Sequence, residues 1–251
     1  MQERLIAIAR LVVAYTAMTI TGSLALALRV FSLGALTDFN RRHLVAASSR
    51  LILRVIGVRA LLPRARSRGR EPVMYTFNHN SFLDVLIVTA LGLSDTRCFL
   101  SERTLKFVPL TISALAIGTL YIPQLKHARR RARFFTRVIE RISRERFSVL
   151  VSSEGVHEFI HGIAPFNDGV YRMALASGLP VVPLYLHIPR EVNSLEGFTM
   201  KSGTVRVEEL PAIDTGTWSP ESIDDHVASV RALFVQRFNE AHATDGDAVA
   251  A

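Results

Sequence analysis

The sequence predicts an α/β fold, with a mixed, largely parallel sheet flanked by helices, and two features indicate it. From residue 73 onwards, short apolar runs alternate with amphipathic stretches, which is typical of strands joined by helical crossovers. A long uncharged segment and a basic amphipathic stretch precede them. We therefore expect an N-terminal hydrophobic membrane helix and an amphipathic helix in front of the α/β domain. A chain of 251 residues is long enough for both parts.

The first element is the uncharged segment Leu11–Leu28. As a helix it would be about 27 Å long, close to the hydrocarbon thickness of a bilayer. It is predicted to span a membrane or to be embedded in one. A signal peptide is an alternative, because Ala25–Ala27 has the A-x-A form, and a buried core helix is another. Two arginines precede the segment and ten follow before residue 71, so the positive-inside rule predicts a main domain facing the cytoplasm at the inner membrane.

The second element is Asn40–Val58, where arginines alternate with apolar residues. This pattern predicts a basic amphipathic helix that lies on a membrane, with packing against its own domain as the alternative. Residues 1–56 are therefore expected to form a membrane-associated helical segment. The polar stretch Pro63–Glu71 follows as a loop.

The α/β domain is expected to cover residues 57–241. Its predicted strands are Val73–Phe77, Arg97–Ser101, Thr119–Ile122, Ser148–Ser152, Val181–Leu186 and Thr204–Val207. Its predicted helices are Phe82–Leu91, His127–Arg144, Val170–Ser177 and Pro220–Ala241. The small and polar residues 242–251 are expected to form a disordered tail.

The charge of the chain indicates contact with an anionic surface. The net charge is +8, and three of the 30 basic residues are lysines. A hydrophobic fraction of 49% favours lipid as that surface, and no RNA-recognition or zinc-finger motif is present, so no nucleic-acid partner is expected. Seven arginines surround the apolar stripe of His127–Arg144, either as a solvated rim or as a contact for lipid headgroups or an acyl-carrier protein. Cys98 is the single cysteine, which excludes an intrachain disulfide.

The stretch NHNSFLD, residues 78–84, carries the strongest chemical signal. His79 follows an apolar run at the expected exit of a strand, where α/β proteins place active sites. Ser81 is a predicted N-cap for the next helix, and Asp84 lies one turn into that helix. A histidine that a carboxylate orients is a suitable general base for an alcohol. A capping histidine and a solvated aspartate are the alternative.

This stretch resembles the first motif, N-H-x-x-x-x-D, of the glycerolipid acyltransferases, the family of 1-acylglycerol-3-phosphate acyltransferases. Four further patterns follow in the family's order. Gly118–Gln124 stands for G-x-x-F-I-x-R, and Ser153–His157 stands for the block that contains E-G-T-R. Pro165-Phe166 and Gly169 have the spacing of P-F-K-x-G, and Val182–Leu184 stands for the final V-P-V strand. The resemblance covers about residues 57–211.

The resemblance implies a membrane-bound O-acyltransferase of phospholipid biosynthesis, which acts on a lyso-lipid. His79 would deprotonate the acceptor hydroxyl, which attacks the thioester of acyl-CoA or acyl-carrier protein, and Asp84 would orient the imidazole. The chemistry needs neither a metal nor a cofactor. The substrate-binding residues that the resemblance implies are Gly118, Tyr121, Gln124, Glu154, Gly155, His157 and Asn167.

The chain departs from the family at several basic positions. Gln124, Val156-His157 and Asn167 replace an Arg, a Thr-Arg pair and a Lys, and Glu102 aligns with another Lys. Arg and Lys suit a phosphate partner by charge. The acceptor is thus either 1-acylglycerol-3-phosphate, with Lys126, His127 or Arg129 supplying the charge, or a phosphate-free lyso-lipid such as an aminolipid or glycolipid. A non-catalytic lipid-binding protein on the same fold is the alternative function.

A second motif, HEFIH, occupies residues 157–161 and matches the zinc-protease signature H-E-x-x-H. That signature requires a helix, which places both histidines on one face. Gly155 and Gly162 leave room for at most two helical turns, and an expected strand ends just upstream. The sequence therefore favours a loop and no metal. A zinc hydrolase with Glu191 or Glu196 as third ligand is a remote alternative.

Overall fold

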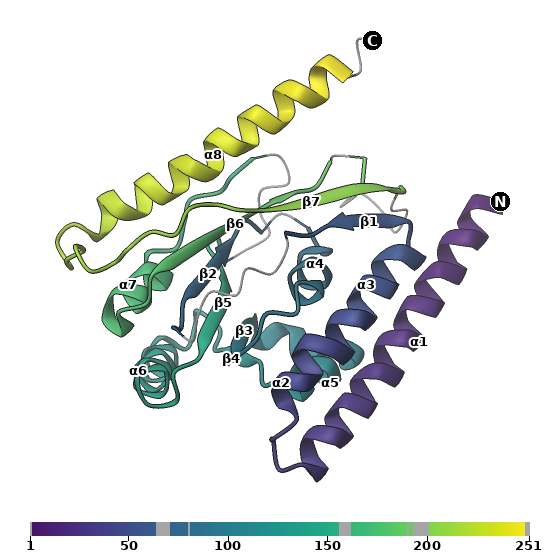
Figure 1. The fold of residues 1–251 in the computed structure, drawn as a ribbon, viewed down its shortest axis with the longest axis horizontal. Coiled ribbons are helices and arrows are strands. Elements are labelled where there is room, and N and C mark those ends of the chain that lie inside the picture. The colour runs from purple at the N-terminus through teal and green to yellow at the C-terminus, as the bar shows by residue number, and fades with distance from the viewer. Residues whose placement is uncertain are drawn as a thin grey trace.

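A seven-stranded mixed sheet forms the centre of the computed structural model, in the order β1-β7-β6-β2-β5-β3-β4 (Figure 1). The structure describes residues 2–63, 71–79, 81–155, 162–189, 191–192 and 201–248. The strands are β1 (Val58–Leu61), β2 (Met74–Phe77), β3 (Thr96–Ser101), β4 (Leu120–Ile122), β5 (Ser148–Ser152), β6 (Val181–His187) and β7 (Gly203–Glu209). Strands β6, β2, β5, β3 and β4 are parallel, whereas β7 runs antiparallel to β6 and β1 is parallel to β7. The predicted mixed, largely parallel sheet is confirmed.

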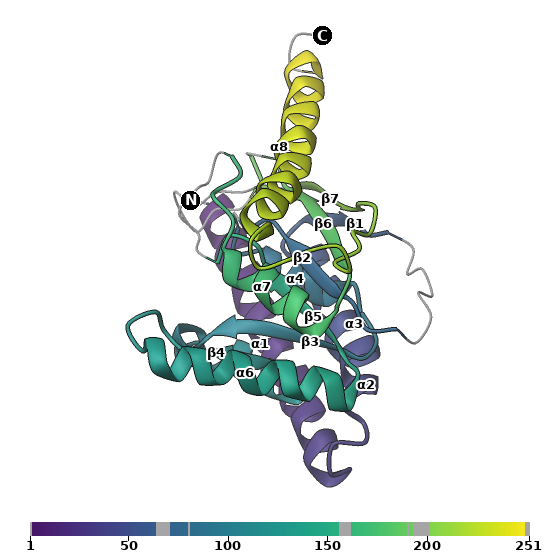
Figure 2. The same ribbon diagram turned by 90° about the vertical axis from the view of Figure 1, so that its left-hand side faces the viewer.

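Helices cover both faces of this sheet (Figures 1 and 2). One face carries α1 (Gln2–Phe31), α2 (Thr37–Phe39), the π-helical segment η1 (Asn40–Val45), α3 (Ala46–Val55), α4 (Asp84–Ala90) and α5 (Val108–Ala116), which follows the 3-10 turn η2 (Glu102–Lys106). The other face carries α6 (Ala128–Glu145), α7 (Asp168–Ser177) and α8 (Ile223–Ala248). Two large apolar cores result, one under α3 and α4 and one under α6, α7 and α8, and a smaller apolar cluster lies between α1, η1 and the end of α5.

The element bounds follow the apolar pattern closely, and the differences that bear most on the architecture are at β1, α5, α4 and α8. Strand β1 lies where the sequence predicts the end of a helix, because Gly57 adopts a φ of +86° and ends α3. Helix α5 has no predicted counterpart. Helix α4 begins at Asp84, two residues later than predicted. Helix α8 continues to Ala248, so the predicted tail from residue 242 is helical over most of its length.

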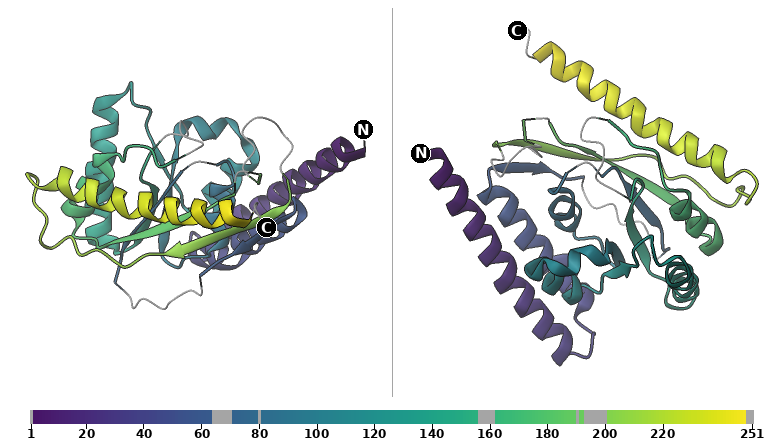
Figure 3. Two further views of the ribbon diagram at one scale, coloured as in Figure 1. Left: turned by 90° about the horizontal axis from the view of Figure 1, so that it is seen from above. Right: turned by 180° about the vertical axis from the view of Figure 1, so that it is seen from behind.

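The N-terminal helix α1 lies lengthwise along α3 and α5 (Figure 3). The contact with α5 is close, because a Cβ at Gly22 would lie 2.5 Å from Oγ of Ser113. The opposite side of α1 exposes large apolar side chains. The stretch Leu5–Phe31 is long and apolar enough to cross a membrane, and 17% of its most apolar window is buried. Helix α1 is therefore not buried on all sides, as the alternative of a buried core helix would require.

Side chains from the N-terminal segment hold the carboxyl end of α5. Arg29 donates to the carbonyl oxygen of Leu115, and Asn40 Nδ2 donates to the carbonyl oxygens of Ala25 (2.7 Å) and Ala116 (3.4 Å). Arg41 donates to the carbonyl oxygen of Ile117 at 2.9 Å. The bonds to Ala116 and Ile117 satisfy carbonyl groups that the end of α5 leaves free. They fix residues 1–56 onto the sheet domain as one packed unit.

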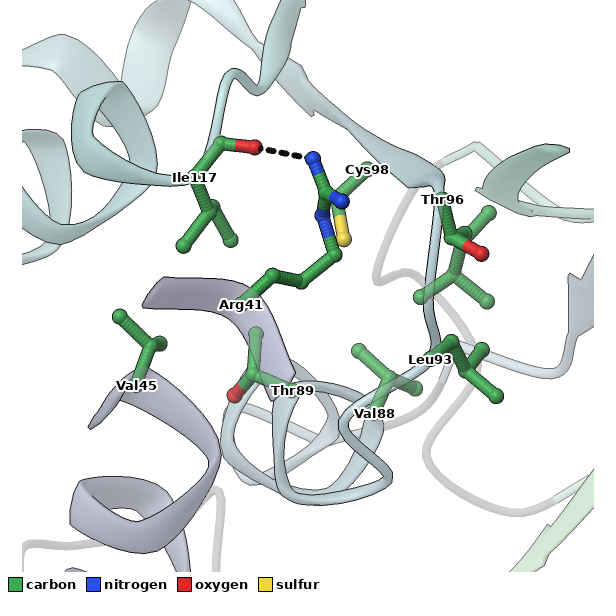
Figure 4. A pocket seen from close by; sticks show the side chains of 9 residues that line it. Arg41, Val45, Val88, Thr89, Leu93, Thr96, Cys98 and Ile117 are labelled. Carbon is green, nitrogen blue, oxygen red and sulfur yellow. Dashed lines mark hydrogen bonds between the residues drawn. The ribbon is translucent and has the colours of Figure 1, made fainter. Parts of the chain in front are cut away.

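Arg41 also borders a small cavity of about 10 Å³, which has room for about one water molecule (Figure 4). Cys98 lies beside it and is partly buried, and desolvation raises the pKa of its thiol to about 11. The thiol therefore stays protonated at neutral pH, and reactive chemistry is not expected from it.

Candidate active site

The candidate site lies where the central strand β2 ends, between β5 and β6. Asn78, the first residue after β2, is 1% exposed. Its Nδ2 donates to the carbonyl oxygen of Leu186 at 3.0 Å, and its Oδ1 accepts from the amide of Leu186 at 2.7 Å. The side chain thus continues the β2–β6 pairing beyond Phe77. This bond fixes the start of the turn that carries His79, a role that the sequence analysis missed although Asn78 opens the first motif.

His79 and Asp84 form the predicted pair. His79 Nδ1 lies 2.9 Å from Asp84 Oδ2, and the Asp84 side chain is completely buried while that of His79 is 16% exposed. The same carboxylate oxygen accepts from the amide of Ser81 at 3.1 Å. A carboxylate at Nδ1 favours the tautomer with its proton on Nδ1 and leaves the lone pair on Nε2. The pair can therefore accept a proton from a hydroxyl at Nε2.

The turn between these two residues differs slightly from the prediction. Leu83, not Ser81, occupies the N-cap position of α4. The Oγ of Ser81 accepts from the amide of Leu83 at 3.1 Å, which tightens the turn before the helix. Asp84 is therefore the first residue of α4, directly opposite the imidazole.

Glu154 braces the backbone of His79. It follows β5, is 4% exposed, and its Oε1 accepts from the amide of His79 at 3.1 Å. Its Oε2 accepts from the amide of Ala164 at 3.3 Å. Burial raises the pKa of this carboxyl group, against the lowering effect of the two backbone donors. The family resemblance implies acceptor binding, but in the structure both oxygens of Glu154 bind backbone amides.

Gly155 and Asn167 lie at the same end of β5. Asn167 caps α7 by accepting from the amide of Gly169 at 3.0 Å, and its own amide donates to the carbonyl oxygen of Ser153 at 2.7 Å. Gly155 has a φ of +74°, and a Cβ there would lie 3.6 Å from Asn167 Nδ2. Gly155, predicted from the third block, and Asn167, predicted from the P-F-K-x-G pattern, thus meet beside Glu154.

A buried pair of hydroxyl groups lies beneath this corner and was not predicted. The Tyr171 hydroxyl donates to Oγ of Ser153 at 3.0 Å. Burial raises the pKa of Tyr171, so it stays a neutral donor. An apolar helix position such as Tyr171 gives no sequence signal for this role.

The second block is split between the two ends of β4. Tyr121 lies in β4 and Gln124 follows it, at the edge of the sheet where the parallel strands end. Three strand spacings of about 4.8 Å place β4 roughly 14 Å from β2. Burial raises the pKa of Tyr121. Gly118 precedes β4, at the opposite edge of the sheet from His79.

The backbone conformation at position 118 explains why this residue is a glycine. Its φ is +75°, and a Cβ there would lie 3.0 Å from a guanidinium nitrogen of Arg97. Other residues rarely adopt this backbone region. The structure therefore places Gly118 in the turn before β4 and away from the predicted acceptor site.

His157 and the whole HEFIH segment lie outside the described residues, as does Glu196. Among the residues that the structure does describe, no three His, Cys, Asp or Glu side chains gather in a way that could hold a metal ion.

A histidine held by a buried carboxylate, at the carboxyl end of a central parallel strand, is an arrangement that can abstract a proton from a substrate in an α/β enzyme. Residues 56–187, more than half of the chain, match the family model described as Acyltransferase. The chain therefore belongs to this acyltransferase family, as its motifs predict.

Similar proteins agree with this family. The 1-acyl-sn-glycerol-3-phosphate acyltransferase of Salmonella typhimurium is 23% identical over 168 residues, which cover 66% of this chain and 67% of the relative. A human relative, 1-acyl-sn-glycerol-3-phosphate acyltransferase beta, is 27% identical over 69% of this chain and 63% of its own. The crystal structure of the 1-acyl-sn-glycerophosphate (LPA) acyltransferase PlsC from Thermotoga maritima has the same fold. Its TM-score is 0.75 at 15% identity, over 95% of this chain and 96% of that one.

Proposed function

We propose that this protein is a membrane-bound O-acyltransferase that acylates 1-acylglycerol-3-phosphate or a related lyso-lipid. The observation that carries the proposal is the His79–Asp84 pair at 2.9 Å, at the strand exit of an acyltransferase fold. The relatives named for 1-acylglycerol-3-phosphate support that acceptor.

In the proposed reaction the acceptor hydroxyl gives its proton to His79 Nε2 as its oxygen attacks the thioester carbonyl of the donor. The new C–O bond forms and the C–S bond breaks when the tetrahedral intermediate collapses. The leaving thiolate then takes the proton from the imidazolium, which restores the neutral histidine. Asp84 holds the ring throughout and stabilises the imidazolium. No step requires a metal or cofactor.

The acceptor phosphate needs cationic partners that the altered motifs no longer supply. Lys126 and His127 are exposed in the loop after β4, at the edge of the sheet where His79 emerges. We propose that these two residues take over the phosphate contact from the position that Gln124 now occupies.

Membrane binding is proposed for the face formed by α1 and α5. Exposed apolar side chains on α1 include Ile8, Val12, Tyr15, Ile20, Leu24 and Phe31. Phe107 and Val108 extend this surface at the start of α5, where the Phe107 ring contacts that of Tyr15 at 6.0 Å between centroids. Because α1 lies lengthwise on the domain, this face would be embedded along its length rather than cross the bilayer alone. The excess of arginines after α1 favours the cytoplasmic side of the inner membrane.

The test is an acyltransferase assay with purified protein in mixed micelles. Acyl-CoA is supplied with a panel of acceptors: 1-acylglycerol-3-phosphate, its dephosphorylated form, a lyso-aminolipid and a lyso-glycolipid. Mass spectrometry is expected to find phosphatidic acid as the main product, absent with His79→Ala. Product from the phosphate-free acceptors alone would show that the acceptor is a phosphate-free lyso-lipid and not 1-acylglycerol-3-phosphate. No product from any acceptor would refute acyl transfer and leave a lipid-binding role.

A further inference from the structure

We propose that the outer face of α6 docks an acidic acyl-carrier protein that delivers the acyl thioester. The inference deepens the proposed function, on which it rests, because it names the macromolecular donor.

The charged residues of α6 are mostly positive. The helix holds seven arginines and two glutamates. Arg129, Arg133 and Arg137 are four residues apart and exposed, and no carboxylate in the described part of the chain pairs with them. The arginines around them behave differently, since Arg141 and Arg144 pair with Glu145, and Arg130 pairs with Glu102. Like charges four residues apart destabilise a helix unless an external anion compensates them.

The position of this stripe suits a donor that approaches the site from outside the membrane. Helix α6 begins after β4, at the edge of the sheet where His79 emerges, and runs towards the opposite edge. The stripe from Arg129 to Arg137 is about 12 Å long. This extended footprint suits the acidic surface of a protein better than CoA, whose diphosphate and 3′-phosphate lie close together around one ribose.

The layer arrangement favours a protein over a lipid surface as the anion. Helix α6 lies with α7 and α8 on one face of the sheet, whereas α1 and α5 form the other (Figures 1 and 2). A flat membrane that contacts α1 along its length therefore does not reach the stripe on α6. The arginines of α3, on the α1 side, are the ones placed for lipid.

The test compares two donors for one enzyme in micelles: palmitoyl-CoA and a bacterial acyl-carrier protein loaded with palmitate. The double variant Arg133→Glu/Arg137→Glu is expected to lose at least tenfold in kcat/KM with the carrier and less than twofold with CoA. The matched control Arg50→Glu/Arg54→Glu reverses two exposed charges on α3 and should keep the wild-type ratio of the two kcat/KM values.

Three outcomes would overturn the docking inference. They are an unchanged ratio in the α6 variant, whether or not both activities fall, wild-type activity with CoA alone, and a loss of anionic-vesicle binding in the α6 variant instead. Wild-type protein that is inactive with both donors would refute the proposed function itself, which is a separate result.

A different observation carries a second inference. The structure assigns Arg231, on the C-terminal helix α8, as a positioning residue for His79. Its Nε donates to the carbonyl oxygen of Ala164 at 2.9 Å and another guanidinium nitrogen donates to that of Ile163 at 2.6 Å. The amide of Ala164 then donates to Glu154, whose other oxygen accepts from the amide of His79.

This chain of bonds connects helix α8 to the proposed base. The family match ends at residue 187, so Arg231 lies outside the matched residues. A planar guanidinium can hold two neighbouring carbonyl groups at once, which an ammonium group does less well. Release of the 163–164 segment would loosen Glu154 and then the backbone of His79.

The test is a double-mutant cycle between Arg231→Ala and Glu154→Gln, with Arg237→Ala as the matched control. Arg237 lies on the same helix and forms ion pairs with Glu208 and Glu240. We expect Arg231→Ala to lower kcat about tenfold with KM for the acceptor within twofold, and Arg231→Lys to recover part of the loss. The two substitutions should be non-additive, because they act on one chain of bonds.

The control Arg237→Ala should leave kcat within twofold. Two results would overturn the assignment. One is a kcat per folded molecule that Arg231→Ala leaves unchanged, with loss of thermal stability alone. The other is full additivity with Glu154→Gln.

Discussion

Replacing Asp84 with Asn tests how the carboxylate directs the imidazole. The carboxylate accepts two hydrogen bonds through Oδ2, from His79 Nδ1 and from the amide of Ser81. Because both donors meet the same oxygen, an amide group of the same shape either places its oxygen there, which keeps both bonds but removes the negative charge, or places its NH2 group there. In the second orientation the NH2 group faces Nδ1 and forces the proton onto Nε2. Nε2 then no longer offers its lone pair to the acceptor hydroxyl.

The magnitude follows from the bond that is lost. A hydrogen bond to a charged group contributes about 1.5–3 kcal/mol, which corresponds to roughly 10- to 150-fold in rate at about 1.4 kcal/mol per tenfold. The inverted tautomer adds to this, so kcat should fall by about 100-fold or more, with KM for the acceptor within twofold.

The assay is steady-state release of CoA thiol in micelles, with thermal unfolding as the check on folding. Asp168→Asn is the matched control, since Asp168 also begins a helix but is exposed and pairs with Arg172. A folded Asp84→Asn protein with kcat within threefold of wild type would refute the orienting role of the carboxylate.

Three further outcomes are expected. His79→Ala should abolish turnover and shift the unfolding temperature little, because the side chain lies at a strand exit; retained turnover would end its assignment as the base. Millimolar chelator should leave activity unchanged and elemental analysis should find no stoichiometric zinc, whereas zinc that is lost on mutation of His161 would revive the hydrolase alternative. Gly22→Val should lower the unfolding temperature by several degrees, because its Cβ meets Ser113 at 2.5 Å and overpacking costs about 1–3 kcal/mol. Ser23→Val, on the exposed side of α1, should not.

A fourth expected outcome concerns how helix α1 binds the membrane. Full-length protein should stay on anionic liposomes as salt rises, since apolar burial is not screened. Deletion of residues 1–36 should leave partial binding that salt removes, because each arginine near an anionic surface contributes about 1 kcal/mol. Flotation with liposomes across a salt series measures the binding of both proteins. If salt alone released the full-length protein from the liposomes, α1 would not be embedded.

Local patterns in the sequence predict most of the fold. Strand β5 was predicted at its observed bounds, Ser148–Ser152, because a buried parallel strand is a short continuous apolar run. The five-residue spacing of His79 and Asp84 predicted their pairing, since it is set within one turn. Helix α5 was missed because VPLTISALA is apolar on all sides and has no helical period.

The supports of the site are long-range and could not be read from local patterns. Asn78 bonds to Leu186, which is 108 residues away in the sequence, and Arg231 bonds to Ala164, which is 67 residues away. The residues around each partner give no local pattern that predicts the contact. Glu154 was found from its motif, but its backbone partners follow from the strand order. Gly118 was assigned to the acceptor site because it belongs to the same motif as Gln124. In the structure, strand β4 lies between these two residues and places them at opposite edges of the sheet.

The most direct test of the central claim is transfer of a 13C-labelled palmitoyl group from palmitoyl-CoA to 1-acylglycerol-3-phosphate by the purified protein, followed by mass spectrometry. The account predicts labelled phosphatidic acid and one free CoA thiol per acyl group transferred by the wild type, and neither with His79→Ala. Equal labelled product from both proteins, or thiol release without labelled lipid, would contradict it.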